Sequence, residues 1–164
     1  MKMRIALMAA AAAGLMLGTV AHAQEAVVGV ANPEALFHSK NPKLDRNKQA
    51  AYHIEKELLE CNEWNRAGEW LTQAYHQHNP QAKSGLPGVV YFFTQVLKVQ
   101  PKPIPVKLGI PVVSVVAEGD RVIVVTPRVV KDPKDPSKSY TTTWFDMWRF
   151  VDGKADEHWD PATR

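Results

Sequence analysis

The stretch FDMWRFVDGKADEHWD near the end of the chain gathers side chains that could transfer protons. It places Asp146, Asp160 and His158 among the tryptophans Trp148 and Trp159. A carboxylate among apolar rings loses hydration and becomes a stronger base, and an indole N–H can donate to a substrate oxygen. Removal of a proton next to a carbonyl needs both such a base and such a donor. The stretch is therefore either an ordinary amphipathic hairpin or the wall of a pocket suited to acid–base chemistry. In the second case Asp160 and Asp146 are the candidate catalytic residues.

The geometry of this hairpin decides whether the two carboxylates can act together. Asp152-Gly153 is a strong two-residue turn signal between two strand-like runs. Such a turn places Asp146 opposite Trp159 and directs Asp160 to the other face. The two acids line one pocket only if a bulge interrupts the hairpin, and we expect it near His158-Trp159, because bulges collect beside active sites. The alternative is that Asp160 is a solvated strand end.

A second candidate element is AYHQHNP, which contains Tyr75, His78 and Asn79. His78 could donate a proton to a substrate oxygen or accept one, which makes it the third candidate catalytic residue. The alternative is a capping turn, because Asn-Pro is good turn chemistry and the histidine can bond backbone groups. The candidate substrate-binding residues are Tyr75, Asn79, Trp144, Trp148, His158 and Trp159.

The sequence gives no positive sign of a metal or an organic cofactor. His78, Asp146, His158 and Asp160 are suitable ligand types, but no HxxxH helix or other ligand spacing supports a site. The run SGLPG lacks the preceding strand and the lysine of a phosphate-binding loop, and no GxSxG nucleophile motif is present. We therefore expect chemistry without a metal, a cofactor or a covalent intermediate.

The elements that must position these residues follow a simple order. Residues 45–61 carry apolar side chains at helical spacing, 66–76 predict a shorter helix, and 84–99 predict a third before the helix-breaking QPKPIP. Four later runs rich in valine, threonine and aromatic residues predict strands at 110–119, 121–130, 140–151 and 154–160. Helices before strands, without alternation, predict an α+β fold with N-terminal helices on one face of an antiparallel sheet.

The beginning of the chain predicts export. A basic start, MKMR, precedes an apolar run over residues 5–20 and the small-x-small signal AHA. We predict a signal peptide over 1–23, cut after Ala23, and hence a periplasmic or secreted protein. Residues 24–43 are then expected to form a loosely ordered leader, and 44–164 one domain.

Processing also changes the charge balance. The full chain has 20 basic and 17 acidic residues, and loss of Lys2 and Arg4 without any acid leaves 18 against 17. The most basic run, RVVKDPKDPSK, is interrupted by acids and prolines and is typical of a solvated loop. We therefore expect no nucleic-acid partner and, after signal cleavage, no membrane attachment.

The order AYHQHNP, GVVYFF, VVAEGDRVIV and WFDMWRFVDGKADEHWD resembles the SnoaL-like polyketide cyclases of the nuclear transport factor 2-like superfamily. The resemblance implies a cone-shaped α+β fold, with helices on a strongly curved sheet around a deep apolar pocket, and often a homodimer. The cyclases of this family catalyse an intramolecular aldol condensation without metal or cofactor. Their catalytic aspartate, in the pattern RxVDGKxxxHxD, matches Asp160.

Three positions depart from the cyclase pattern. Asp146 stands where the cyclases have a pocket histidine, Trp144 where they have a glutamine, and Trp159 where they have an arginine. The polyketide substrate therefore does not carry over with the resemblance, and the identity of the ligand stays open.

Two classes of function remain. The first is a cofactor-independent acid–base enzyme (aldol cyclase, isomerase or dehydratase type) on a small apolar carbonyl compound. The second is a non-catalytic ligand-binding or dimeric association domain. An enclosed cavity ending at Asp146 or Asp160 favours the enzyme, whereas a pocket plugged by Trp144, Trp148 and Trp159 favours the alternative. Valines on both faces of the strands at 110–130 further predict a homodimer through the outer sheet face.

Overall fold

The computed structural model of the protein describes residues 25–163. The predicted signal peptide and its cleavage after Ala23 lie outside the described residues. Within 25–163, no helix has both the length and the apolar character needed to cross a membrane.

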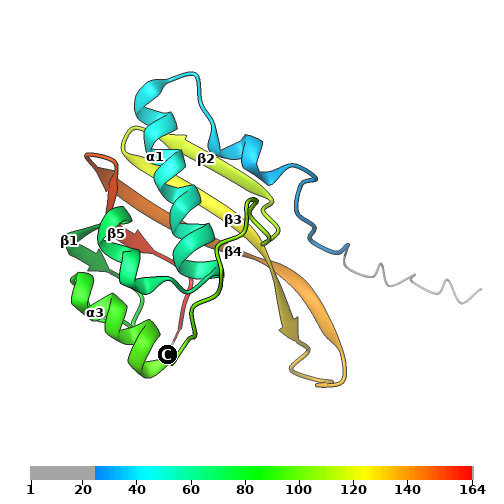
Figure 1. Ribbon diagram of the computed structural model, residues 1–164. Coiled ribbons are helices and arrows are strands. Elements are labelled where there is room, and N and C mark those ends of the chain that lie inside the picture. The colour runs from blue at the N-terminus through cyan, green and yellow to red at the C-terminus, as the bar shows by residue number, and fades with distance from the viewer. Residues whose placement is uncertain (1–24, 164) are drawn as a thin grey trace, which may run out of the picture.

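Helices occupy most of the first half of the described chain (Figure 1). A helix begins as α1 (Pro42–His53) and continues as the π-helix η2 (Ile54–Glu60), which confirms the helix expected over 45–61. Asn41 caps it by accepting hydrogen bonds from the N–H groups of Lys43 and Leu44. The other helical elements are η1 (Pro33–Phe37), η3 (Trp64–Arg66), α2 (Ala67–Trp70), α3 (Leu86–Tyr91) and the π-helix η4 (Phe92–Val96).

In the described part of the chain, five strands form one open sheet in the order β1-β5-β4-β3-β2. They are β1 (Leu71–Gln77), β2 (Ser114–Glu118), β3 (Arg121–Lys131), β4 (Ser139–Val151) and β5 (Lys154–Trp159). The four strands predicted in the second half are confirmed, although the first begins at Ser114 and not at residue 110. The predicted turn is also confirmed, since Asp152 and Gly153 have φ of 49° and 81°, the left-handed values that a tight hairpin turn requires.

One predicted helix is wrong. Only Ala67–Trp70 is helical in the segment 66–76, and the chain then enters strand β1. The buried residues Leu71 and Tyr75 are four apart, a spacing that suits one face of a helix and, being even, also one face of a strand. Because β1 pairs in parallel with β5, the sheet is mixed, and the expectation of a purely antiparallel sheet is corrected.

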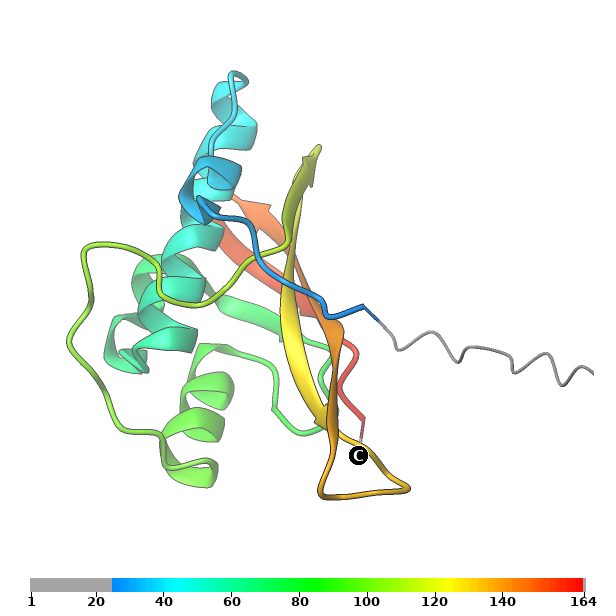
Figure 2. The same cartoon turned by 90° about the vertical axis from the view of Figure 1, so that its right-hand side faces the viewer.

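Within residues 25–163, the helices cover one face of the sheet and leave the other without a helical layer (Figure 2). This arrangement confirms the predicted α+β class. The main core lies between the two layers, where Leu58, Val89, Val122, Val124 and Trp148 are almost completely buried. The β3–β4 hairpin is longer than the helical layer and extends beyond it as an arm (Figure 1).

The leader is more firmly held than the sequence predicted. The N–H of Val30 donates to the carbonyl of Val112, and the N–H of Val27 donates to the Thr141 hydroxyl on β4. Phe37 is 0% exposed, and its ring packs edge-on against Tyr52 of α1. A segment that supplies a core aromatic residue is part of the domain, so the expectation of a loosely ordered leader is corrected for residues 25–41.

Candidate functional site

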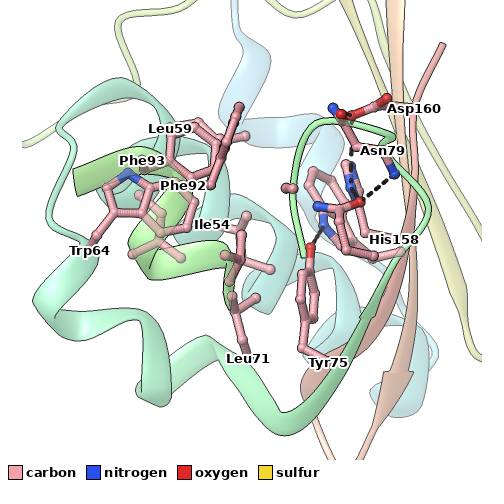
Figure 3. A pocket seen from close by; sticks show the side chains of 15 residues that line it. Ile54, Leu59, Trp64, Leu71, Tyr75, Asn79, Phe92, Phe93, His158 and Asp160 are labelled. Atoms are coloured by element: carbon pink, nitrogen blue, oxygen red, sulfur yellow. Dashed lines mark hydrogen bonds and ion pairs between the residues drawn. The ribbon is translucent and has the colours of Figure 1, made fainter. Parts of the chain in front are cut away.

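A cavity of about 50 Å³ lies between the helical layer and the sheet (Figure 3). Its two sides differ in chemistry. The helices supply an apolar side, on which Trp64 and Phe93 stack with ring centroids 3.8 Å apart. The sheet and the residues that follow β1 and β5 supply a polar side, where Tyr75, Asn79, His158 and Asp160 point toward one another (Figure 3).

The two π-helical segments line the apolar side of this cavity. Ile54 and Leu58 come from η2, and Phe92 and Phe93 come from η4. π-Helical turns are rare and occur often at functional sites. In η2 the wider turn accompanies five consecutive buried residues, 54–58, which an ordinary amphipathic surface helix does not show.

A bulge in the closing hairpin brings the candidate acids to one face. Arg149 pairs with Glu157 but Phe150 pairs with Ala155, so Asp156 is the additional residue. The bulge that the sequence analysis required is therefore present, but at Asp156 and not near His158-Trp159. With the register shifted by one, Trp148 faces His158, and Asp146, His158 and Asp160 offer ligand atoms within 4.8 Å of one another.

His158 is held from both sides through its ring nitrogens. Nδ1 lies 2.9 Å from Gln77 Oε1, and Nε2 lies 3.0 Å from Asp146 Oδ1. Gln77 Oε1 also accepts the N–H of Asn79 at 3.0 Å, which identifies this atom of the amide as the acceptor. Nδ1 must therefore donate to Gln77, and a second proton lies between Nε2 and Asp146.

This proton arrangement bears on metal binding. Asp146, His158 and Asp160 form the one candidate metal group found within residues 25–163. A histidine binds a metal through a ring nitrogen that carries no proton. Because both nitrogens of His158 face hydrogen-bond acceptors, the arrangement suits proton transfer better than metal coordination.

Asp160 lines the cavity and has well-defined partners. Its Oδ2 accepts a hydrogen bond from Asn79 Nδ2 at 2.8 Å, and its Oδ1 accepts the N–H of Ala162 at 2.8 Å. A carboxylate oxygen can accept two hydrogen bonds, so these contacts orient the group and leave capacity for a proton from a ligand. Its side chain is 5% exposed, and so the alternative of a solvated strand end does not describe Asp160.

Tyr75 supplies a hydrogen-bond donor to the same cavity. Its hydroxyl accepts the indole N–H of Trp148 at 3.3 Å. The hydrogen bonds among the described residues give its own proton no acceptor, so that proton is free to donate to a ligand oxygen. Burial is the main cause that raises the pKa of Tyr75, which keeps the hydroxyl protonated.

Glu55 is a buried acid that the sequence analysis missed. It lies on η2 with 2% exposure, and its Oε1 has no hydrogen-bond partner among the residues that the structure describes. Burial, and then the neighbouring charge of Asp146, raise the pKa of Glu55 well above its usual range. A signal was available, since Glu55 follows Ala51 by four residues and precedes Leu58 by three, which places it within the apolar stripe of the helix.

Three predicted site residues lie elsewhere. His78 is on the outer side of the sheet, where it stacks on Trp159 with centroids 5.1 Å apart and contacts Glu157 at 2.8 Å. Trp144 lies further along β4, beneath the guanidinium of Arg128. None of His78, Trp159 and Trp144 lines the cavity. Gln77, which the sequence analysis did not select, lies inside instead.

The buried Glu55 makes a prediction about stability and pH. Folding raises the pKa of Glu55 above the ordinary glutamate value of 4.5. The contribution of Glu55 to stability is therefore complete below pH 4.5, and it is lost as the pH rises through the pKa of the folded state. Glu55→Gln keeps the shape and stays neutral. As the pH rises, the wild type should therefore lose stability relative to Glu55→Gln. We expect the difference between their free energies of unfolding to reach about 1.4 kcal/mol for each unit by which folding raises the pKa of Glu55.

Urea unfolding at a series of pH values measures this difference. Glu118→Gln, an exposed change on β2, serves as the matched control and should follow the wild type at each pH. Parallel curves for Glu55→Gln and the wild type would show that Glu55 titrates as an ordinary acid.

Comparison with known proteins gives a consistent result at the level of the fold. No family model matches the chain, and no curated protein matches it. Among solved structures, a candidate SnoaL-like polyketide cyclase from Jannaschia sp. CCS1 aligns with a TM-score of 0.52 and 17% identity, over 76% of this chain and 91% of that chain. A candidate polyketide cyclase from Acidithiobacillus ferrooxidans aligns with a TM-score of 0.51 and 12% identity, over 70% and 86%.

These similarities define the class of structure. The chain shares the α+β fold of these two solved structures. The resemblance drawn from the closing hairpin is thereby confirmed at the level of the fold. At such identities the likeness does not extend to substrate or reaction.

Proposed function

We propose that this protein is a cofactor-independent acid–base enzyme that acts on a small apolar carbonyl compound, as an aldol cyclase, isomerase or dehydratase. The observation that carries the proposal is the position of Asp160, Tyr75 and His158 together at the polar end of an otherwise apolar cavity. A base and a proton donor converge there on the space that a carbonyl group would occupy.

In this proposal each polar residue has a defined role. Asp160 accepts the proton from the carbon next to the carbonyl, and the electron pair of that C–H bond moves onto the carbonyl oxygen. The Tyr75 hydroxyl donates a hydrogen bond to the developing oxyanion. His158, held by Gln77 and Asp146, lies beside Asp160, with its Nδ1 at 3.9 Å from Asp160 Oδ2. Asp146 acts as a positioning residue, since it does not line the cavity.

The size of the cavity favours a second candidate, a non-catalytic ligand-binding or association domain. At about 50 Å³ the cavity is far smaller than the roughly 300–1,000 Å³ of common ligand pockets. Trp148 fills part of the cavity, as the hypothesis of a non-catalytic domain expects. Trp144 and Trp159, which that hypothesis also places in the cavity, do not line it. For the enzyme, the cavity must widen when a ligand enters.

A thermal-shift screen of apolar carbonyl compounds tests the proposal. A compound at a hundred times its dissociation constant stabilises the folded protein by about 2.7 kcal/mol, which is readily detected. The enzyme proposal expects a hit whose binding weakens with Tyr75→Phe. Binding that is indifferent to Tyr75 would contradict the assigned carbonyl position.

For localisation we propose export to the periplasm or outside the cell, as the signal sequence predicts. The mature N-terminus is then expected at Gln24, because Ala23 ends the cleavage signal. Mass spectrometry of protein recovered after expression with its own signal measures this. A chain that retains Met1, or that carries a lipid, would contradict it.

We also propose that a second copy covers the outer face of the sheet. The register aligns Val116, Ile123, Met147 and Trp159 in one row across four strands, with Phe145 beside it at 47% exposure. A homodimer burying at least about 1,200 Å² would remove this row from water. Met147→Glu should give monomers by sedimentation at micromolar concentration, while Val28→Glu should not. A wild-type monomer would contradict the proposal.

A further inference from the structure

We propose that an open groove next to the cavity binds a carboxylate on the same small carbonyl compound, through Arg128 held against Trp144. The inference rests on the proposed function, which it narrows to carbonyl compounds that carry an acid group. The groove has a volume of about 460 Å³, within the range of common ligand pockets. It is lined by Arg128, Trp144, Asn79, Gln81 and the C-terminal residues 161–163.

The groove continues the face of the sheet that carries the cavity. Trp144, Asp146 and Trp148 alternate along β4 with one residue between each, so their side chains share a face. Trp148 lies beneath the helices, whereas Trp144 lies on the β3–β4 arm beyond them. A ligand can therefore extend along one surface from the covered part to the open part.

Arg128 is positioned to bind an anion. Its guanidinium carbon lies 4.1 Å from the centroid of the Trp144 ring. Its N–H groups form no hydrogen bond with the other described residues, so they are available for two parallel hydrogen bonds to a carboxylate. Among residues 25–163, no carboxylate forms an ion pair with Arg128, so its charge is available to a ligand. The tryptophan also fixes the arginine in advance, which lowers the ordering cost of binding.

Asn79 lies where the cavity meets the groove. It lines both the cavity and the groove. Its amide donates to Asp160, and its Oδ1 accepts the N–H of Gln81. The Asn79–Asp160 hydrogen bond therefore lies between the catalytic end of the site and the Arg128 end. Like charges repel, so Asp160 directs a carboxylate away from the cavity and toward Arg128, which leaves the carbonyl end to enter beside Tyr75.

The test compares β-benzoylpropionate, an aryl ketone with a carboxylate, with its uncharged methyl ester. Isothermal titration gives the dissociation constant of each compound at low and high salt. We expect the wild type to bind the acid at least about tenfold more tightly than the ester, the scale of a charge-assisted hydrogen bond. Arg128→Gln should remove this preference and leave ester binding unchanged. Lys131→Gln, another exposed cation on β3, should preserve the preference.

Three results would overturn the inference: no binding of the acid, equal binding of acid and ester by the wild type, or a preference that survives in Arg128→Gln. These outcomes are distinguishable from failure of the proposed function. If the ester binds and exchanges its α-proton without any preference for the acid, the enzyme proposal stands and the groove assignment fails. If the acid is preferred but no α-proton exchanges, the groove assignment stands and the enzyme proposal fails.

Discussion

Asp160→Asn is expected to slow exchange of the α-proton of a bound carbonyl compound by at least about a hundredfold, which corresponds to about 2.7 kcal/mol in activation free energy. The amide keeps the size of the carboxylate but cannot accept the proton. The ligand should still bind with a similar dissociation constant, because the apolar wall and Tyr75 are unchanged. A loss of rate without a loss of affinity identifies an interaction made in the transition state.

The closing hairpin provides a matched control for this substitution. Asp152→Asn changes an acid to its amide in the turn, away from the cavity, where asparagine suits the φ of 49°. It should leave exchange unaffected. Asp146→Asn should have an intermediate effect, because it weakens the hold on His158 without touching the ligand. If Asp160→Asn exchanges as fast as the wild type, Asp160 is not the base.

Phe37→Ala is expected to lower the free energy of unfolding by about 3–5 kcal/mol. The side chain is 0% exposed, and its removal leaves a cavity between the leader and α1. The hydrogen bond from Gln49 Nε2 to the Phe37 carbonyl, at 2.9 Å, holds the backbone in place and limits collapse of that cavity.

Urea unfolding of Phe37→Ala and Val28→Ala tests whether the leader is part of the folded domain. Val28 lies in the same leader but is 72% exposed, so its change should cost less than about 0.5 kcal/mol. Similar stabilities for the two variants would mean that the leader is not part of the folded core.

Much of the fold was predictable from local patterns. Helical spacing and the absence of glycine and proline predicted the helix that α1 and η2 form, and Asp152-Gly153 predicted the turn between β4 and β5. Strand β1 was not predictable in this way, because Leu71 and Tyr75 fit both a helix and a strand. Its identity depends on pairing with β5, more than eighty residues later, and local spacing carries no information about that partner.

The wrong helix prediction for residues 66–76 also explains why His78 was wrongly selected as a site residue. On a strand, successive side chains point to opposite faces, so Gln77 and Asn79 point inward and His78 points outward. Interpreted as the end of a helix, the segment gave no such alternation. His78 was chosen for its chemistry and for its position after the predicted helix, and neither shows which face its side chain occupies. The need for a bulge was predictable, because Asp146 and Asp160 come to one face only if a bulge interrupts the hairpin. Its position was not predictable, and the strand pairing places it at Asp156.

The most direct test of the central claim is isotope exchange by the wild-type protein in deuterated buffer, with a carbonyl compound taken from the thermal-shift screen. Mass spectrometry of the recovered compound measures deuterium next to the carbonyl. The acid–base proposal predicts incorporation at least about a hundredfold faster than in buffer alone, and its loss in Asp160→Asn. A compound that binds the wild type tightly and returns without deuterium would contradict the proposal and identify a binding protein.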